Sequence, residues 1–243
     1  MDLKCRLYDI PGIPNMRDLG GYETKDDGTI QMGRFIRSTA LADIGMDAVS
    51  ELKALNIDCV IDLRSKMERK RAPDIIEKHG GIHFVHVPML DHIQSNFVKG
   101  DFSGGFPASM AEMYTGLLDN SAYSFKTVFD VFADKRFSHY LFHCAAGKDR
   151  TGVTAMLLLG LAGVPAEIIA EDYSYTQYLF EPSVPIEDFP LEIPRYLFES
   201  APPTMMATLR HLDETYGGVK PYLSHIGVSG ENIQAVLDKL LLD

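Results

Sequence analysis

The densest group of reactive side chains in this sequence is the segment 143–152, His-Cys-Ala-Ala-Gly-Lys-Asp-Arg-Thr-Gly. A cysteine, Cys144, is followed by an arginine, Arg150, with five residues between them. That length is enough to wrap backbone N–H groups around one tetrahedral oxyanion, because successive inward-pointing amides form a concave anion site. The guanidinium of Arg150 adds a planar fork suited to two oxygens of the anion. The spacing therefore predicts an anion-binding loop built around a nucleophile.

The elements on either side hold this loop in place. The run Tyr140–His143 is typical of a buried strand, and Val153–Ala162 follows an apolar helical pattern. The first turn of a helix has unpaired N–H groups and the positive end of the helix dipole, so it attracts an anion and favours the thiolate form of a nearby cysteine. The alternative is a structural cysteine with an arginine nearby by chance, but the strand–loop–helix context favours a catalytic loop.

The other loop residues have expected roles. Gly147 allows a turn where a side chain would block close approach, and Thr151 places a hydroxyl where it can cap the helix or donate to the sulfur. We expect the ring of His143 to order the loop by hydrogen bonding. The residues predicted to contact a bound phosphate are Ala145, Ala146, Gly147, Lys148, Thr151 and, from another segment, Arg64.

The segment 143–152 resembles the signature of the cysteine-dependent protein tyrosine and dual-specificity phosphatases. Two further segments, Asn15–Tyr22 and Asp62–Ser65, are similar to a narrower group, the atypical bacterial tyrosine phosphatases that carry Gly-Lys-Asp-Arg-Thr in the loop. The similarity extends from about residue 14 to residue 240. It implies a phosphomonoesterase in which the Cys144 thiolate attacks phosphorus and water later hydrolyses a cysteinyl-phosphate.

A general acid must protonate the leaving oxygen, and two aspartates are candidates. Asp149 lies inside the loop, and Asp91 follows a predicted strand, as does the mobile acid loop of typical tyrosine phosphatases. Asp149 could instead orient Arg150, and Asp91 could instead cap a helix. The resemblance favours Asp149, because the atypical bacterial group and the myotubularin-like lipid phosphatases carry aspartate at this distance from the cysteine.

Two basic features raise the question of the substrate. Lys148 is either a solvated cation or a contact for a second phosphate on an inositol ring, as in phosphoinositide phosphatases; Ala145 departs from their pattern, which has lysine directly after the cysteine. The run Arg64–Arg71 carries five basic residues in eight. It is either a solvated helix face or a rim that attracts acidic or multiply phosphorylated substrates.

Supporting residues come from other segments. Asp62 and Arg64 follow a predicted strand, so they should lie at the same sheet edge as Cys144. We expect Asn15, Arg17 and Asp18 to tie the N-terminal segment to the edge of the sheet, and Arg17 could also reach the substrate pocket.

Strands alternate with helices, which predicts an α/β fold with a mostly parallel central sheet, helices on both faces and a helical C-terminal elaboration. The expected strands are 35–38, 59–63, 82–87 and 140–143, and the expected helices are 43–55, 110–118, 125–133, 153–162 and 165–178. We expect residues 1–243 to form a single phosphatase domain. The proline-rich stretch at about 178–205 is either an irregular surface connection or a lid over the active site.

Composition limits the remaining possibilities. The 243 residues carry a formal charge of −11, which argues against nucleic acid and anionic membranes as partners. Three cysteines do not suggest a disulfide framework, although Cys59 could trap Cys144 as a disulfide. No histidine spacing demands a metal. We expect no metal, no cofactor, no stable membrane insertion and a cytoplasmic location.

The preferred function is therefore hydrolysis of phosphotyrosine, extending to phosphoserine, phosphothreonine or phosphoinositides, with inorganic phosphate as product. The alternatives are a phosphatase acting primarily on phosphoinositides, a non-catalytic phosphate-binding module, and a sulfur- or arsenate-handling enzyme with a similar loop. The sequence does not fix the oligomeric state.

Overall fold

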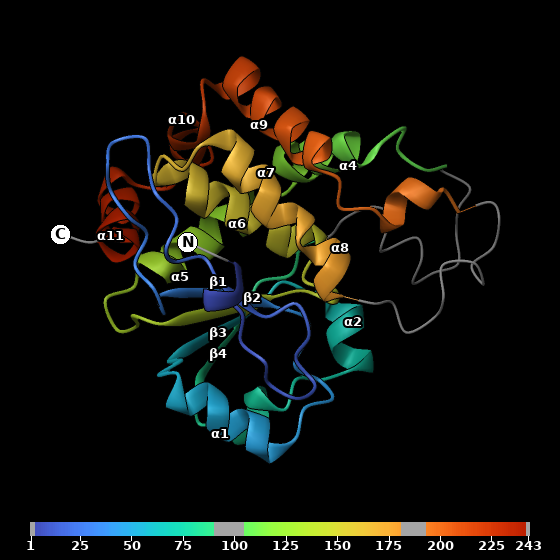
Figure 1. Cartoon of the computed structure of the whole chain (residues 1–243), viewed down its shortest axis with the longest axis vertical. Coiled ribbons are helices and arrows are strands. Elements are labelled where there is room, and N and C mark those ends of the chain that lie inside the picture. Colours follow the sequence, from blue (N-terminus) through green and yellow to red (C-terminus); the bar gives the residue numbers. More distant parts are fainter. Residues whose placement is uncertain (1–2, 90–104, 181–192, 242–243) are drawn as a thin grey trace.

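A five-stranded sheet in the order β1-β2-β5-β3-β4 runs through the molecule, which is described here from a computed structural model covering residues 3–89, 105–180 and 193–241 (Figure 1). Strands β2, β5, β3 and β4 are parallel to one another, and the edge strand β1 is antiparallel to β2. The bounds are β1 Arg17–Asp18, β2 Phe35–Ser38, β3 Cys59–Asp62, β4 His83–His86 and β5 Tyr140–His143. All four predicted strands are confirmed, and the two-residue β1 was too short to be predicted.

Helices cover both faces of this sheet, so the predicted α/β class is confirmed. Their bounds are α1 Met46–Ala54, α2 Lys66–Arg71, α4 Met110–Asn120, α5 Ala122–Ala133, α6 Asp149–Leu161, α7 Ala166–Ser174, α8 Thr176–Leu179, α9 Pro202–Tyr216, α10 Val219–His225 and α11 Gly230–Leu240. Three short helical turns are η1 Leu3–Cys5, η2 Ile76–Gly80 and η4 Arg195–Phe198. Within the described residues, none of the helices has both the length and the apolar surface to cross a bilayer.

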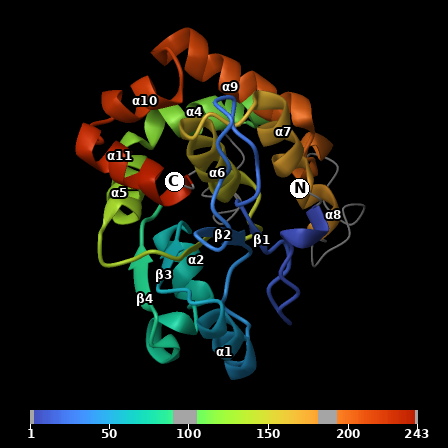
Figure 2. The ribbon, with the colours of Figure 1, turned by 60° about the vertical axis from the view of Figure 1, so that its left-hand side comes forward.

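The side chains of the central strands alternate between two cores. In β5, Tyr140 and Phe142 belong to the larger core, while Leu141 belongs to the smaller one, as expected for a strand buried on both faces. The smaller core lies under α1, and the larger one lies under α4 to α7 and α9 to α11 on the other side of the sheet (Figure 2). Both faces of β5 are thus fixed by packing, which holds its carboxyl end rigidly.

The C-terminal helices confirm the predicted elaboration, and the proline-rich stretch is described only in part. Residues 181–192 lie outside the described part of the chain. Beyond them, α9 begins at Pro202, near the expected end of the stretch at about residue 205. Proline suits the first turn of a helix, because its missing N–H would have no partner there and its φ is already helical.

Candidate active site

Cys144 follows β5 directly, at the carboxyl edge of the sheet and between the ends of β2 and β3. Its side chain is fully buried, whereas the next residue, Ala145, is exposed. Helix α6 begins at Asp149, so the segment 144–148 forms the whole loop between strand and helix. The strand–loop–helix arrangement predicted for this segment is confirmed.

Three consecutive carbonyl groups of this loop are held by groups outside it. The carbonyl oxygen of Ala145 accepts from the Ala40 N–H at 3.0 Å, and that of Ala146 accepts from the Asn15 side-chain amide at 3.0 Å. The carbonyl oxygen of Gly147 accepts from Nη2 of Arg37 at 2.7 Å. The N–H of each following residue lies on the opposite side of the same planar peptide. The amides of residues 146–148 therefore point away from these partners, as a concave anion site requires.

Gly147 is the position where this loop needs glycine. Its φ of +68° is left-handed, and a Cβ placed on it would lie 2.4 Å from the carbonyl oxygen of Ser38. Backbone at the end of β2 cannot move aside easily, because that strand is paired on both sides. The prediction that Gly147 permits a close approach is confirmed.

Arg150 is fixed by a carboxylate that the sequence analysis did not identify. Its Nη1 and Nη2 each donate at 2.8 Å to one oxygen of Glu68, and the Arg150 side chain is fully buried. Glu68 is itself anchored at the start of α2, where it and Ser65 exchange hydrogen bonds in a capping box. Burial raises the pKa of Glu68, but Arg150 and Ser65 lower it more, so the net shift is downward. The Ser65-x-x-Glu68 spacing was the available signal for this contact.

Asp149 lies at the first position of α6 and points to a tyrosine rather than to solvent. The hydroxyl of Tyr114 donates to its Oδ1 at 2.7 Å, and the Lys148 ammonium lies 3.5 Å from the same oxygen. The two outer nitrogens of Arg150 pair with Glu68, so Glu68 and not Asp149 supplies the bidentate contact that orients it. The other candidate acid, Asp91, lies outside the described residues.

Lys148 is neither solvated nor free. Its Nζ donates to the carbonyl oxygens of Leu197 at 2.6 Å and Glu199 at 3.2 Å, and its side chain is 8% exposed. The ammonium thus ties the catalytic loop to the segment around η4. Both interpretations of Lys148 made from the sequence, a solvated cation and a free contact for a second phosphate, differ from this arrangement.

The basic run 64–71 divides into a buried and an exposed part. Arg64 is buried, and its guanidinium pairs with Asp62 and Asp74, so it is committed inside the protein instead of facing phosphate. Arg69 pairs with Glu77. The outer face of α2 borders a hollow of about 330 Å³, whose lining includes Lys66, Arg69, Lys70 and Lys78.

His143 belongs to a buried cluster below the loop. Its Nε2 forms an ion pair of 3.0 Å with Asp74, and its Nδ1 lies 3.2 Å from the carbonyl oxygen of Cys144. Burial pulls the pKa of His143 down, but Asp74 and Asp62 raise it above its ordinary value. This agrees with the predicted role of ordering the loop.

The same cluster has the composition of a metal site, since ligand atoms of Asp62, Asp74 and His143 lie within 4.8 Å of one another. However, Nη2 of Arg64 is 2.9 Å from both carboxylates. The Arg64 guanidinium and the His143 ring already contact the two carboxylates, so a metal ion would have to displace the guanidinium. We assign the group as an ion-pair cluster.

A second buried cluster holds the other side of the loop. Asp172 on α7 pairs with Arg17 at 3.0 Å, Arg37 at 2.8 Å and Arg6 at 3.5 Å, and all four side chains are buried. Burial raises the pKa of Asp172, but the arginines lower it further, to about 2. Burial and Arg17 lower the pKa of Arg37 to about 10.

The N-terminal residues have the tying role expected of them. Arg17 lies in the edge strand β1, and its Nη1 donates to the side chain of Asn15, which in turn holds the catalytic loop. Asp18 accepts from the Gly20 and Gly33 amides at 2.7 Å and 2.6 Å. Arg17 is fully buried, and its guanidinium pairs with Asp172.

Two further predictions concern the sulfur. The hydroxyl of Thr151 is buried and has no hydrogen-bond partner among the described residues, so it neither caps α6 nor bonds to the thiol.

The prediction that Cys59 could trap Cys144 as a disulfide is wrong. Cys59 pairs with Tyr140 in the parallel register, which places Cys144 four residues further along. At about 3.3 Å per residue that is roughly 13 Å, whereas a disulfide needs Cα atoms within about 7 Å.

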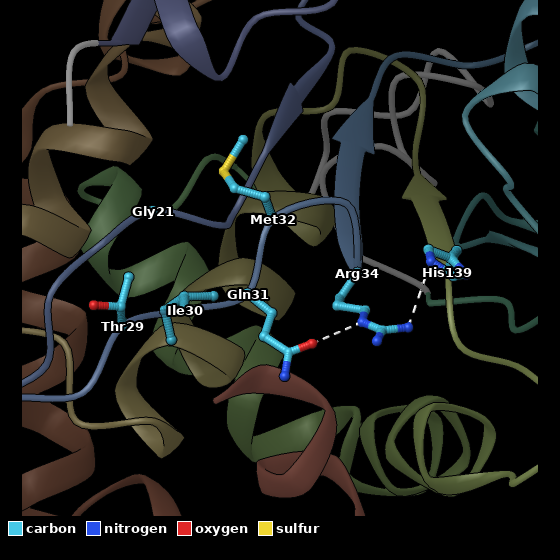
Figure 3. A pocket seen from close by; sticks show the side chains of 7 residues that line it. All are labelled: Gly21, Thr29, Ile30, Gln31, Met32, Arg34 and His139. Atoms are coloured by element: carbon cyan, nitrogen blue, oxygen red, sulfur yellow. Dashed lines mark hydrogen bonds between the residues drawn. The ribbon is translucent and has the colours of Figure 1, made fainter. Parts of the chain in front are cut away.

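A larger hollow of about 430 Å³ lies away from this site (Figure 3). Figure 3 shows Arg34 reaching Gln31 and His139 in its lining. Arg34 and His139 directly precede β2 and β5, so this hollow borders the starts of the strands, at the sheet edge opposite Cys144. It does not contribute to the catalytic loop.

Comparison with known proteins identifies the family of this chain. Residues 8–242 match the profile of a tyrosine phosphatase family. The chain is 31% identical over 251 residues to a tyrosine-protein phosphatase of Nostoc commune, covering 97% of this chain and 77% of that protein. It is 25% identical over 285 residues to the triple specificity protein phosphatase PtpB of Mycobacterium tuberculosis, covering 97% and 99%. Among solved structures, the core catalytic domain of the PP-IP phosphatase SIW14 from S. cerevisiae aligns with a TM-score of 0.39 and 15% identity, over 62% of this chain and 76% of that one.

Proposed function

This chain belongs to the tyrosine phosphatase family and is a phosphoric monoester hydrolase, and we propose that it works through a cysteinyl-phosphate on Cys144. The observation that carries the proposal is the outward anchoring of the three loop carbonyls at residues 145–147. It turns the amides of residues 146–148 away from these partners, as binding of a phosphate inside the loop requires. Donors that are fixed before the substrate arrives stabilise developing charge most effectively.

In the first step, the Cys144 thiolate supplies the electron pair for a new S–P bond while the bond from phosphorus to the leaving oxygen breaks. Arg150 and the loop amides hold the other three phosphate oxygens as their charge redistributes. Asp149 donates its proton to the leaving oxygen and becomes a carboxylate. The bidentate contact with Glu68 supports this role of Arg150, because it fixes the plane of the guanidinium.

In the second step, water attacks phosphorus, Asp149 accepts the proton of that water, and the S–P bond breaks. The products are inorganic phosphate and the regenerated thiolate. Since the nucleophile must remain a thiol, a reducing compartment such as the cytoplasm suits this chemistry.

We propose phosphotyrosine as the main substrate, with phosphoserine and phosphothreonine as slower ones. A second candidate class, phosphoinositides, is favoured by the hollow beside α2, where Lys66, Lys70 and Lys78 surround a space on the far side of the helix from Glu68. Glu77 also lines this hollow, where it pairs with Arg69, so the three lysines give the hollow a net positive charge that attracts acidic ligands.

A substrate panel on three proteins tests the proposal: the wild type, Cys144→Ser and Cys59→Ser. Cys59 is the matched control, because it is also buried but lies at the opposite end of its strand from the loop. We expect phosphotyrosine hydrolysis and a phosphocysteine trapped by acid quench in the wild type and in Cys59→Ser. Cys144→Ser should bind inorganic phosphate without turnover. Undiminished turnover in Cys144→Ser would rule out the covalent mechanism, and binding without turnover in the wild type would indicate a phosphate-binding module.

A further inference from the structure

The two oxygens of Asp149 have different surroundings. Oδ1 accepts the Tyr114 hydroxyl at 2.7 Å and lies 3.5 Å from the Lys148 ammonium. Among the described residues, Oδ2 takes part in no hydrogen bond or ion pair. The Asp149 side chain keeps 11% of its surface exposed, whereas Tyr114 on α4 is fully buried. One oxygen is thus anchored in the interior and the other is left open.

The Tyr114 hydroxyl has a second partner, the hydroxyl of Tyr173, which can donate to it. Its oxygen lies 2.7 Å from the hydroxyl oxygen of Tyr173 on α7, and the two rings meet edge to face at 5.8 Å. A hydroxyl has one proton and two lone pairs. When Tyr114 accepts from Tyr173, its own proton is available for Asp149. Burial, and after it the Asp149 carboxylate, raises the pKa of Tyr114 well above its usual value, so this hydroxyl stays protonated.

We propose that Tyr114 is a positioning residue that selects which oxygen of Asp149 carries the catalytic proton. The inference rests on the proposed function, in which Asp149 is the general acid. A proton on Oδ1 would point into the Tyr114 hydroxyl and towards the Lys148 ammonium, both of which are donors. The acid form therefore carries its proton on Oδ2, the oxygen that has no other partner among the described residues.

The proton balance follows from this arrangement. Asp149 gives the Oδ2 proton to the leaving oxygen, and Tyr114 keeps its own proton throughout. The new carboxylate is then stabilised at Oδ1 by a neutral hydroxyl and a cation. A hydrogen bond to a charged acceptor is stronger than one to a neutral acceptor, so the Tyr114 contact strengthens as the proton leaves. It also holds the carboxylate in place while it accepts the proton of water in the second step.

Tyr114→Phe tests this role, because it removes the hydroxyl and keeps the ring. Its matched control is Tyr222→Phe, which removes another fully buried hydroxyl, the one that donates to the Leu118 carbonyl oxygen at 2.9 Å on the same helix α4. Each variant is assayed with p-nitrophenyl phosphate, whose leaving group needs no proton, and with phosphoserine, whose leaving group does. Asp149→Asn is assayed in parallel.

We expect Tyr114→Phe to slow kcat for phosphoserine by about 10- to 100-fold, the worth of one hydrogen bond to a charged group, and to change p-nitrophenyl phosphate little. Asp149→Asn should show the same dependence more strongly, and adding Tyr114→Phe to it should have no further effect. Tyr222→Phe should slow both substrates equally or not at all. If Tyr114→Phe folds poorly, Tyr173→Phe should show a smaller loss with the same dependence on the leaving group.

The possible failures are distinguishable. If Asp149→Asn depends on the leaving group but neither tyrosine variant does, Tyr114 has no positioning role and Asp149 remains the acid. If Asp149→Asn lacks the dependence as well, the acid lies elsewhere and both proposals are wrong. Equal losses on both substrates in Tyr114→Phe would mean that the hydroxyl serves only the fold.

Discussion

Asp172→Asn should destabilise the protein strongly, although Asp172 lies on α7, outside the loop that contains Cys144. The variant keeps the shape of the side chain but leaves Arg6, Arg17 and Arg37 buried without their shared carboxylate. The pKa of Asp172 is about 2, compared with about 3.9 for a free aspartate. That difference alone corresponds to about 2–3 kcal/mol of stability at neutral pH.

The full loss should be larger, because an unpaired buried charge typically costs about 3–5 kcal/mol. For a chain of this size each kcal/mol shifts the melting temperature by roughly 2–4 °C, so the expected drop is roughly 6–20 °C. Thermal and urea unfolding at pH 7 measure it. Arg37 also holds the Gly147 carbonyl, so turnover should fall together with stability.

Asp134→Asn is the matched control. The pKa of Asp134 is also about 2, lowered by Arg136, but that arginine is 70% exposed and water screens the pair. The loss of stability in Asp134→Asn should be a small fraction of the loss in Asp172→Asn. A carboxyl with a depressed pKa stabilises above its unfolded pKa and loses that effect as the pH falls. The gap between wild type and Asp172→Asn should therefore narrow from about pH 4 towards pH 2. Equal stability losses in the two variants at pH 7 would refute the reasoning.

Three further predictions concern the loop and its supports. Glu68→Gln removes the charge that fixes the catalytic arginine and should lower kcat/KM by about 10- to 100-fold; an unchanged kcat/KM would contradict this. Gly147→Ala would set a Cβ 2.4 Å from the Ser38 oxygen and should abolish phosphate binding, measured by calorimetry, whereas Gly163→Ala, with a φ of +83° but open space, should retain it. Because the pKa of His143 is raised in the folded protein, its protonation stabilises the fold fully below pH ~6.5, and this stabilisation is lost as the pH rises through the folded pKa. The free energy of unfolding of the wild type should therefore fall in that range with a contribution from His143 of up to about 1.4 kcal/mol per pH unit. His143→Gln should lack this contribution, which urea unfolding at several pH values measures.

The strand–loop–helix arrangement around Cys144 and the strands of the sheet could be predicted from the sequence because both depend on local pattern. Apolar runs such as Cys59–Asp62 and Tyr140–His143 are long enough to be recognised, and Gly147 marks the turn. The short β1 has no such pattern. It is a strand because Arg17 and Asp18 pair with β2, and that pairing is decided by the tertiary structure.

The partners of the buried charged side chains could not be predicted from the sequence for a different reason. Asp172 lies 135 residues from Arg37 and inside an ordinary amphipathic helix, so nothing local distinguishes it from a solvated carboxylate. The position of Glu68 at the start of a helix could have been predicted from its capping box with Ser65. The basic residues around it made the segment look uniformly cationic. Lys148 was misplaced because its partners are backbone carbonyl oxygens near residue 198, which no side-chain pattern reveals.

These contacts explain how a chain with a net charge of −11 can hold a phosphate dianion. Lys148 contributes little to a free positive surface, since its ammonium is bound by carbonyl oxygens. The cluster of Arg6, Arg17 and Arg37 has only one carboxylate as an ion-pair partner in the described chain, Asp172, and it contacts the loop through Gly147. Buried charges are screened by salt much less than exposed ones. The cluster thus places positive charge beneath the loop, where salt screens it little, and this supports the proposed binding of phosphate there.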